Sequence, residues 1–183
     1  MADHLAETAH QILPDEIIQV VAYGCTSGTI EIGEKRIKDE IQKSKKDTQI
    51  TTPITAAVKA FNLSKFKKIA VLTPYPKEVN IKVYNYLLNE GLDIMSFNSF
   101  NLNYDSEIAK VTKKSLIETI SSINLKNVDC LFVSCTALKI VDLIDDLEKE
   151  LNINLISSNQ AIIWDSLRLS KINQIINGFG RLF

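Results

Sequence analysis

Short apolar segments rich in Ile, Val, Leu and Phe alternate along the chain with longer amphipathic segments. The short segments predict buried β-strands, because strands covered on both faces are nearly continuous apolar runs. We expect strands at Ile17–Ala22, Lys68–Thr73, Asp93–Phe97, Val128–Val133 and Asn154–Ile156. Strands that alternate with helices are typical of βαβ units around a parallel sheet. The pattern therefore predicts an α/β fold.

The segments between these strands carry apolar residues at helical spacing. Val79, Val83 and Leu87 repeat every four residues and predict one such helix. Similar faces are formed by Leu116, Ile117, Ile120 and Ile123, and by Ile140, Ile144, Leu147 and Leu151. Thr51-Thr52-Pro53 predicts a capped helix start with proline in the first turn. We expect further helices at Asp3–Leu13 and, with Asn159 as a cap, at Ala161–Leu169.

Composition narrows the class of protein. The chain has 183 residues, of which 45% are hydrophobic and 23% charged, and no Pro/Gly/Ser-rich linker divides it, so we expect a single globular unit over residues 1–183. The formal net charge of -1 provides no basic field for nucleic acid. No segment approaches the roughly 18 uninterrupted apolar residues of a membrane span. We therefore expect neither a nucleic-acid nor a membrane partner.

The amino-terminal residues indicate the cellular location of the protein, and the cysteines and histidines indicate whether it binds a metal. Residues 1–7 contain acidic side chains and lack the features of a signal peptide, which predicts a cytoplasmic protein. Three cysteines without a C-x-x-C pair predict free thiols rather than disulfides or a zinc site. His4 and His10 have no cysteine or carboxylate at a recognised ligand spacing. We expect no metal.

One short pattern occurs twice, at residues 20–28 (VVAYGCTSG) and 131–138 (LFVSCTAL). In each copy a predicted strand is followed by a small residue, Cys and Thr. Ligands of open parallel sheets bind outside the carboxyl ends of the strands, so we expect Cys25 and Cys135 at the same edge. We also expect a helix to begin at each cysteine, where free N–H groups and the helix dipole lower a thiol pKa and hold an anion. The pattern indicates thiolate chemistry on a carboxylate.

Cysteine is also a common small buried residue, and a single cysteine after a strand is more often part of the core than a catalyst. We assign Cys130 to packing, because it lies inside a predicted strand between Asp129 and Leu131. Cys25 and Cys135 share a strand end and a following threonine. From spacing alone, both a paired catalytic role and a structural role stay open for these two residues.

Several segments together resemble a known family. They are residues 23–28 (YGCTSG), 72–75 (LTPY) with 78–80 (EVN), 134–138 (SCTAL), and 157–161 (SSNQA) with Trp164 and 167–169 (LRL). In this order they resemble the Asp/Glu racemase superfamily, in the branch of maleate cis-trans isomerases and arylmalonate decarboxylases. The resemblance implies a parallel-sheet three-layer αβα sandwich of two pseudo-symmetric halves, which meet near residues 60–70 and 165–183. It also implies a cofactor-free enzyme with one cysteine from each half facing a small carboxylate.

The resemblance also assigns roles. Cys25 matches the nucleophile, which adds to the double bond of a cis-dicarboxylate, and Cys135 matches the group that donates and withdraws the proton. Rotation and elimination of the thiol then give the trans acid. The groups that match hydrogen-bond donors to the carboxylates or the intermediate are Thr26, Ser27, Tyr75 and Thr136. Without the resemblance, the first two suit helix caps and Tyr75 suits a turn. We expect an isomerase or racemase most like maleate isomerase, with homo-oligomer formation left open.

Two features depart from the family pattern. The family begins with an additional strand and a Pro-Ser-Ser-Asn-like loop that supplies an Asn to the substrate, whereas this chain opens on the helix predicted from Asp3, so we interpret it as truncated at its amino terminus. Asp105-Ser106 stands where the isomerases have Asp-Asn, which predicts a weaker or different second carboxylate contact. The alternatives are an arylmalonate decarboxylase, which typically has Gly in place of Cys25, an Asp/Glu-type amino-acid racemase, and a non-enzymatic carboxylate-binding domain.

Overall fold

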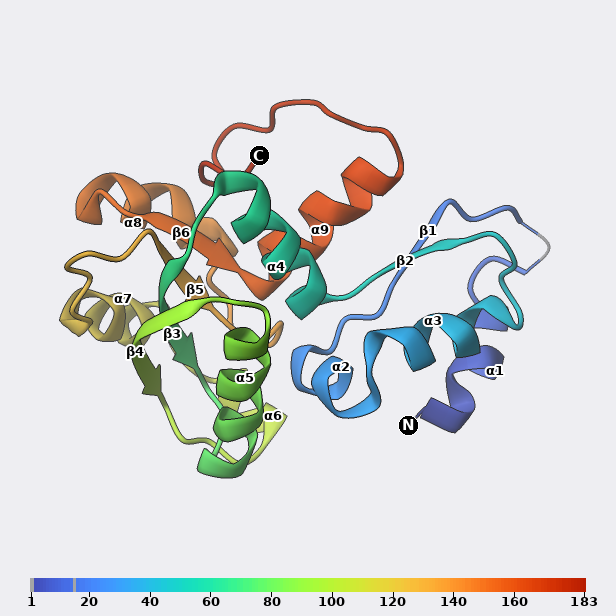
Figure 1. Cartoon of the computed structure of the whole chain (residues 1–183), viewed down its shortest axis with the longest axis horizontal. Coiled ribbons are helices and arrows are strands. Elements are labelled where there is room, and N and C mark those ends of the chain that lie inside the picture. Colours follow the sequence, from blue (N-terminus) through green and yellow to red (C-terminus); the bar gives the residue numbers. More distant parts are fainter. Residues whose placement is uncertain (1, 15) are drawn as a thin grey trace.

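Two parallel β-sheets form the framework of the molecule, whose computed structural model describes residues 2–14 and 16–183 (Figure 1). The smaller sheet pairs β1 with β2, and the larger has the strand order β4-β3-β5-β6, with every neighbouring pair parallel. The bounds are β1 Val20–Ala22, β2 Gln49–Thr51, β3 Lys68–Thr73, β4 Asp93–Ser99, β5 Cys130–Val133 and β6 Asn154–Ser157. The predicted α/β class with parallel sheets is confirmed.

The strand predictions differ from the structure mainly in the smaller sheet. The strand predicted from Ile17 begins only at Val20, where β2 provides a partner, and Ile17 itself is 97% exposed. Strand β2 was not predicted, because its one apolar residue, Ile50, lies between Gln49 and Thr51 and makes no apolar run. In the larger sheet β4 extends to Ser99, two residues beyond the prediction.

Helices fill the connections. Their bounds are α1 Leu5–His10, α2 Thr26–Ile32, α3 Glu34–Gln42, α4 Pro53–Ser64, α5 Lys77–Asn89, α6 Asp105–Ile108, α7 Lys113–Ser122, α8 Ile144–Leu151 and α9 Ser158–Leu169, with 3-10 turns at Ala2–His4 and Val141–Leu143. Thr52 caps α4 through the N–H of Thr55, as predicted. The amino-terminal helix ends at His10, short of the predicted Leu13. No helix in the described ranges is long and apolar enough to cross a membrane.

The larger sheet lies between two layers of helices. Helices α4 and α5 cover one face, and α7 and α8 cover the other (Figure 1). For α5, α7 and α8, which connect strands within this sheet, the placement agrees with right-handed crossovers. The central strands β3 and β5 are buried, and Phe132 of β5 packs edge-to-face on Phe61 of α4 with 5.5 Å between the ring centroids. Such aromatic pairs add about 0.5–1.5 kcal/mol beyond their buried area. The larger sheet and the helices on its two faces enclose the main hydrophobic core.

The smaller sheet has a separate core, and α9 packs against it while the neighbouring α2 packs against α4 and α5. Its buried apolar residues are Ala9, Val21, Ile37, Ile41 and Ile50. Helix α9 packs against α4 and against both strands of this sheet. Within that interface Asp165, which is 4% exposed, accepts hydrogen bonds from the Thr51 hydroxyl at 2.5 Å and from the Lys59 amine at 2.7 Å. One carboxylate therefore ties α9 to β2 and to α4.

We expect Asp165→Asn to lower the free energy of unfolding by about 1–3 kcal/mol, because it removes a buried charged acceptor from two donors. Urea unfolding followed by circular dichroism measures the change. Asp93→Asn is the matched control, since Asp93 is exposed at the start of β4 and such substitutions usually change stability by less than about 0.5 kcal/mol. Equal stability of the two variants would contradict the structural role of Asp165.

Candidate active site

The two cysteine motifs lie on loops that contact each other. One loop leaves β1 after Ala22 and the other leaves β5 after Val133. The hydroxyl of Thr136 donates a hydrogen bond of 2.8 Å to the carbonyl oxygen of Gly24, and this bond joins the loops directly. The carboxyl ends of strands from two different sheets thus meet at one place, whereas the sheet rule had led us to expect both cysteines at the edge of one sheet.

Cys25 lies at the start of α2 and is half-buried. Its sulfur accepts a hydrogen bond from the backbone N–H of Gly28 at 3.3 Å, and the Ser27 hydroxyl lies 3.8 Å from it. The prediction of a helix start at this cysteine is therefore confirmed. Glycine is required at position 28, because a Cβ atom there would lie 2.6 Å from the Tyr23 hydroxyl and 2.9 Å from the Cys25 sulfur.

Cys135 has a different local structure, and here the prediction of a helix start was wrong. Its φ is +93°, which is uncommon for a residue other than glycine and takes the chain away from a helical path. The residues that follow form a turn, and the next helical residue is Val141. The Asn159 side-chain amide donates to the carbonyl oxygens of Thr136 and Leu138 at 3.0 and 3.3 Å. Asn159 thus fixes this turn and does not cap α9.

The expectation of a lowered thiol pKa was also wrong for Cys135. Burial raises the pKa of this thiol above its ordinary value. Hydrogen bonds with the Ala137 N–H and the Tyr75 hydroxyl act in the lowering direction, while the negative charges of Asp105 and Cys25 raise the pKa further. Because burial is the largest of these effects, Cys135 keeps its proton at neutral pH.

Tyr75 reaches the site from the loop after β3. Burial is the main reason that its phenol pKa is raised, with the neighbouring Cys135 second, and its hydroxyl also interacts with Thr26. The carbonyl oxygen of Tyr75 is held from the other side by the Asn80 amide and the Ser99 hydroxyl, each at 2.7 Å. Buried and bonded in this way, Tyr75 directs a protonated hydroxyl toward Cys135.

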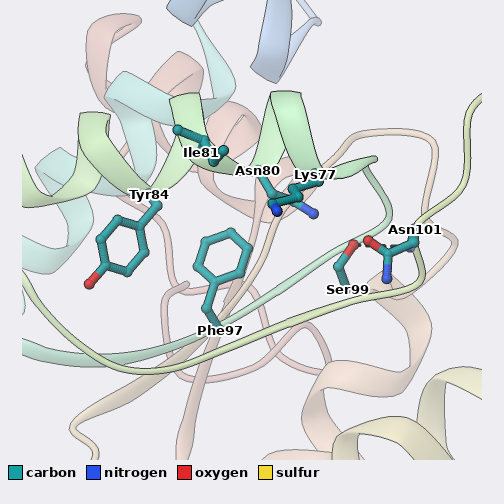
Figure 2. Close-up of a pocket in the computed structure, with 7 residues that line it drawn as sticks. All are labelled: Lys77, Asn80, Ile81, Tyr84, Phe97, Ser99 and Asn101. Atoms are coloured by element: carbon teal, nitrogen blue, oxygen red, sulfur yellow. Dashed lines mark hydrogen bonds between the residues drawn. The ribbon is translucent and has the colours of Figure 1, made fainter.

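The residues behind Tyr75 also line a cavity of about 450 Å³ at the outer edge of the larger sheet (Figure 2). The cavity lies between α5 and β4, and its lining residues are Lys77, Asn80, Ile81, Tyr84, Phe97, Ser99 and Asn101. Figure 2 shows the rings of Tyr84 and Phe97 side by side and Ser99 beside Asn101. Neither cysteine motif contributes to this lining. The cavity is therefore separate from the site formed by the Cys25 and Cys135 loops.

The structure brings together all six residues singled out from the sequence. Thr26 is buried, and its hydroxyl lies 3.1 Å from that of Ser158. Ser27 is next to the Cys25 sulfur and also lines a second cavity of about 230 Å³ between α2 and α5. Thr136 uses its hydroxyl proton on the Gly24 carbonyl, so this side chain acts first as a link between the loops.

Cys130 lies outside this cluster. It is fully buried inside β5, and burial strongly raises its pKa. The assignment of this thiol to packing agrees with the structure. Among residues 2–14 and 16–183, His, Cys, Asp and Glu side chains do not gather in any group of three or more that could hold a metal ion.

Sequence reasoning missed Ser158. This residue is fully buried at the start of α9, and its hydroxyl accepts the backbone N–H of Cys135 at 3.0 Å. The preceding residue, Ser157, is the helix cap, and it forms a capping box with Gln160. Two adjacent serines before a helix look alike in sequence, so the pattern could not separate a cap from a contact with the site.

Comparison with known proteins identifies the family. A family model described as arylmalonate decarboxylase matches residues 3–183, which is nearly the whole chain. The chain belongs to the arylmalonate decarboxylase family. Its curated relatives include a maleate isomerase from Pseudomonas putida, 22% identical over 178 residues, covering 93% of this chain and 71% of that protein. Arylmalonate decarboxylase from Bordetella bronchiseptica is 26% identical over 136 residues, covering 73% of this chain and 57% of that protein.

Solved structures of a maleate cis-trans isomerase and of an arylmalonate decarboxylase share the fold. Maleate cis-trans isomerase from Nocardia farcinica, in a cysteine-to-serine mutant with a covalently bound succinylcysteine intermediate, superposes with a TM-score of 0.90 at 20% identity over 100% of this chain and 77% of that chain. Arylmalonate decarboxylase superposes with a TM-score of 0.81 at 23% identity over 100% of this chain and 80% of that chain. The Asp/Glu racemase-like fold inferred from the motifs is thereby confirmed.

The three thiols of this protein differ in exposure, and the rate at which iodoacetamide alkylates each of them tests the difference. Reactivity follows thiolate fraction and access, so we expect Cys25 to be labelled first, Cys135 more slowly and Cys130 only on unfolding. Peptide mass spectrometry at about pH 8 follows each site, close to the ordinary thiol pKa. A small dicarboxylate should slow the labelling of Cys25. Equal rates at all three sites, without protection, would show that the thiols are not distinguished.

Proposed function

We propose that this protein is a cofactor-independent isomerase that uses Cys25 and Cys135 on a small dicarboxylate and converts maleate to fumarate. The observation that carries the proposal is the pairing of two thiols in different environments. Cys25 is half-buried with an N–H donor on its sulfur, whereas Cys135 is buried and keeps its proton. Two like groups whose environments differ in this way supply a nucleophile and an acid.

In the first half of the reaction, the Cys25 thiolate adds to one alkene carbon of maleate. The new C–S bond uses the sulfur electron pair, and the π electrons move to the other alkene carbon and its carboxylate. The alkene carbon that did not bond to sulfur takes the proton of the Cys135 thiol. The product is a succinyl group on Cys25, and Cys135 becomes a thiolate beside the Tyr75 hydroxyl.

In the second half, the carbon–carbon bond is single and can rotate. The Cys135 thiolate withdraws the proton from the carbon that received it, the double bond re-forms, and the C–S bond breaks. Fumarate leaves, and both sulfurs return to their starting states. No outside oxidant or reductant is needed, because every electron pair and proton is recovered within the cycle.

The neighbouring hydroxyls are placed to stabilise the negative charge that develops during addition. Tyr75 is buried between Cys135 and Thr26, where a low dielectric strengthens its interaction with an enediolate-like intermediate. Ser27 and Thr26 follow the nucleophile directly, and we assign them to the carboxylates of the substrate. Thr136 contributes by holding its loop to Gly24, because its hydroxyl proton is used on that carbonyl oxygen.

The relatives support this proposal in two ways. Maleate isomerases are among the curated relatives that match 93% of this chain. A related isomerase forms a covalent succinylcysteine, which is the kind of intermediate that addition of a thiolate to maleate produces. The three cysteines are free thiols, as this chemistry requires, and we propose a reducing cytoplasmic setting for the enzyme.

Decarboxylation of an arylmalonate is the second candidate, and the name of the matching family model favours it. The first cysteine position decides between the two, because the resemblance implies glycine there in the decarboxylase branch. A thiol at Cys25 is unnecessary for a single protonation by Cys135 but is required for addition and elimination. The isomerase is therefore the better-supported activity.

Maleate turnover followed by proton NMR tests the proposal, with phenylmalonate and L-aspartate as parallel substrates. We expect fumarate from maleate only. Cys25→Ser and Cys135→Ser should each lower kcat by about 10³-fold or more, since addition and protonation each need a thiol. Release of CO₂ from phenylmalonate, or exchange of the aspartate α-proton, without fumarate formation would overturn the assignment.

Cys130→Ser serves as the matched control for those two variants. It should lower the free energy of unfolding by about 1–3 kcal/mol, because a hydroxyl replaces a fully buried thiol. Turnover per folded molecule should stay that of the parent. If a folded Cys130→Ser protein were as inactive as the other two variants, the two-thiol mechanism would be wrong.

Tyr75→Phe tests the electrostatic coupling within the site. The Tyr75 hydroxyl lowers the pKa of Cys135, so its removal raises that pKa and should move the alkaline limb of kcat to higher pH. The neutral-pH kcat should fall by about 10²- to 10³-fold through loss of a charge-stabilising donor. Tyr84→Phe, at the separate cavity, should leave both unchanged. An alkaline limb that moves to lower pH in Tyr75→Phe would contradict this coupling.

A further inference from the structure

Ser158 makes two contacts that together span the proposed site. Its hydroxyl oxygen accepts the backbone N–H of Cys135 at 3.0 Å. The same oxygen lies 3.1 Å from the hydroxyl of Thr26, the residue directly after Cys25. Ser158 is fully buried, and Thr26 is 1% exposed, so water does not compete for these bonds. One hydroxyl group thus touches both cysteine loops.

The backbone that Ser158 holds is a strained one. Cys135 has a φ of +93°, and a residue with a side chain stays in such a conformation only where its surroundings over-determine it. Its N–H would otherwise be a buried donor without a partner. The bond to Ser158 satisfies this donor and fixes the direction of the peptide from which the thiol projects.

The hydroxyl of Ser157, the adjacent residue, contacts only the start of α9. Its oxygen accepts the N–H of Gln160 at 3.1 Å, and the Gln160 side-chain oxygen accepts the N–H of Ser157 at 3.3 Å. Ser157 is 1% exposed, which matches the burial of Ser158. The two residues are both serine, are adjacent in the chain and are equally buried. They differ in what their hydroxyl groups contact.

We propose that Ser158 is a positioning residue that holds the Cys135 thiol in register with the Cys25 loop. It does so by fixing the Cys135 peptide through its N–H and by bonding to Thr26 with the same hydroxyl. It does not touch the reacting atoms. The kinetic consequence rests on the proposed isomerase function, whereas the effect on the Cys135 thiol does not.

The first experiment compares Ser158→Ala with Ser157→Ala in maleate turnover and thermal unfolding. We expect Ser158→Ala to lower kcat about 10- to 100-fold with KM changed by less than about threefold, because the proton donor is misplaced while Ser27, which Ser158 does not contact, keeps its place beside a substrate carboxylate. Ser157→Ala should lower the melting temperature at least as much, through loss of the cap, and keep kcat within about twofold.

The second experiment needs no turnover. In a protein carrying Cys25→Ser and Cys130→Ala, Cys135 is the single thiol, and its alkylation by iodoacetamide is followed across pH. Adding Ser158→Ala should speed labelling about fivefold or more and move its midpoint to lower pH, since a released loop exposes the thiol. Adding Ser157→Ala should leave the rate and the midpoint where they were.

The two experiments separate the possible failures. A parent protein that does not convert maleate contradicts the proposed function alone, and the alkylation of Cys135 still decides the role of Ser158. Equal alkylation of the Ser158→Ala and Ser157→Ala proteins would overturn the positioning role. So would losses of kcat that follow the losses of melting temperature in both variants, because a merely structural serine predicts that relation.

Discussion

The left-handed backbone of Cys135 is the constraint on which the candidate site depends. A φ of +93° sends the chain into a turn instead of a helix, and this turn presents the thiol to Tyr75 and to the loop of Cys25. Such a conformation costs about 1–3 kcal/mol for a residue with a side chain. Helix α9 supplies the compensation, because Ser158 accepts the Cys135 N–H and Asn159 holds the next carbonyl oxygens.

The same turn gives the two thiols unequal environments. Cys25 lies at a helix start, half-buried, with a backbone N–H on its sulfur, whereas Cys135 is enclosed and has its pKa raised by burial. Had a helix begun at each cysteine, as the repeated motif suggested, both would have had the environment of a nucleophile. In the proposed mechanism, this break in the repeat lets one residue type serve both as the nucleophile and as the acid.

Much of this arrangement could be predicted from the sequence, and the limits have physical causes. Short, nearly continuous apolar runs predicted the larger sheet, and the repeated motif predicted that Cys25 and Cys135 lie at strand ends, because both are local features of the sequence. Strand β2 was not predicted, because its three residues around Ile50 form no run of apolar residues. The sign of φ at Cys135 and the contact of Ser158 are set by tertiary packing, which residue types and spacing do not encode.

Helix α9 also explains how the smaller sheet and the site stay aligned. Ser158 and Asp165 are seven residues apart, two helical turns, so they project from the same face of α9. One contacts Thr26 on the Cys25 loop, and the other binds Thr51 at the end of β2. Two polar contacts on one helix therefore hold the start of α2 and the end of β2 in place relative to Cys135. The Thr51 carbonyl oxygen also accepts the backbone N–H of Tyr23 at 2.9 Å. A shift of β2 therefore moves the Cys25 loop or breaks one of these bonds, which couples the position of the smaller sheet to the alignment of the thiols.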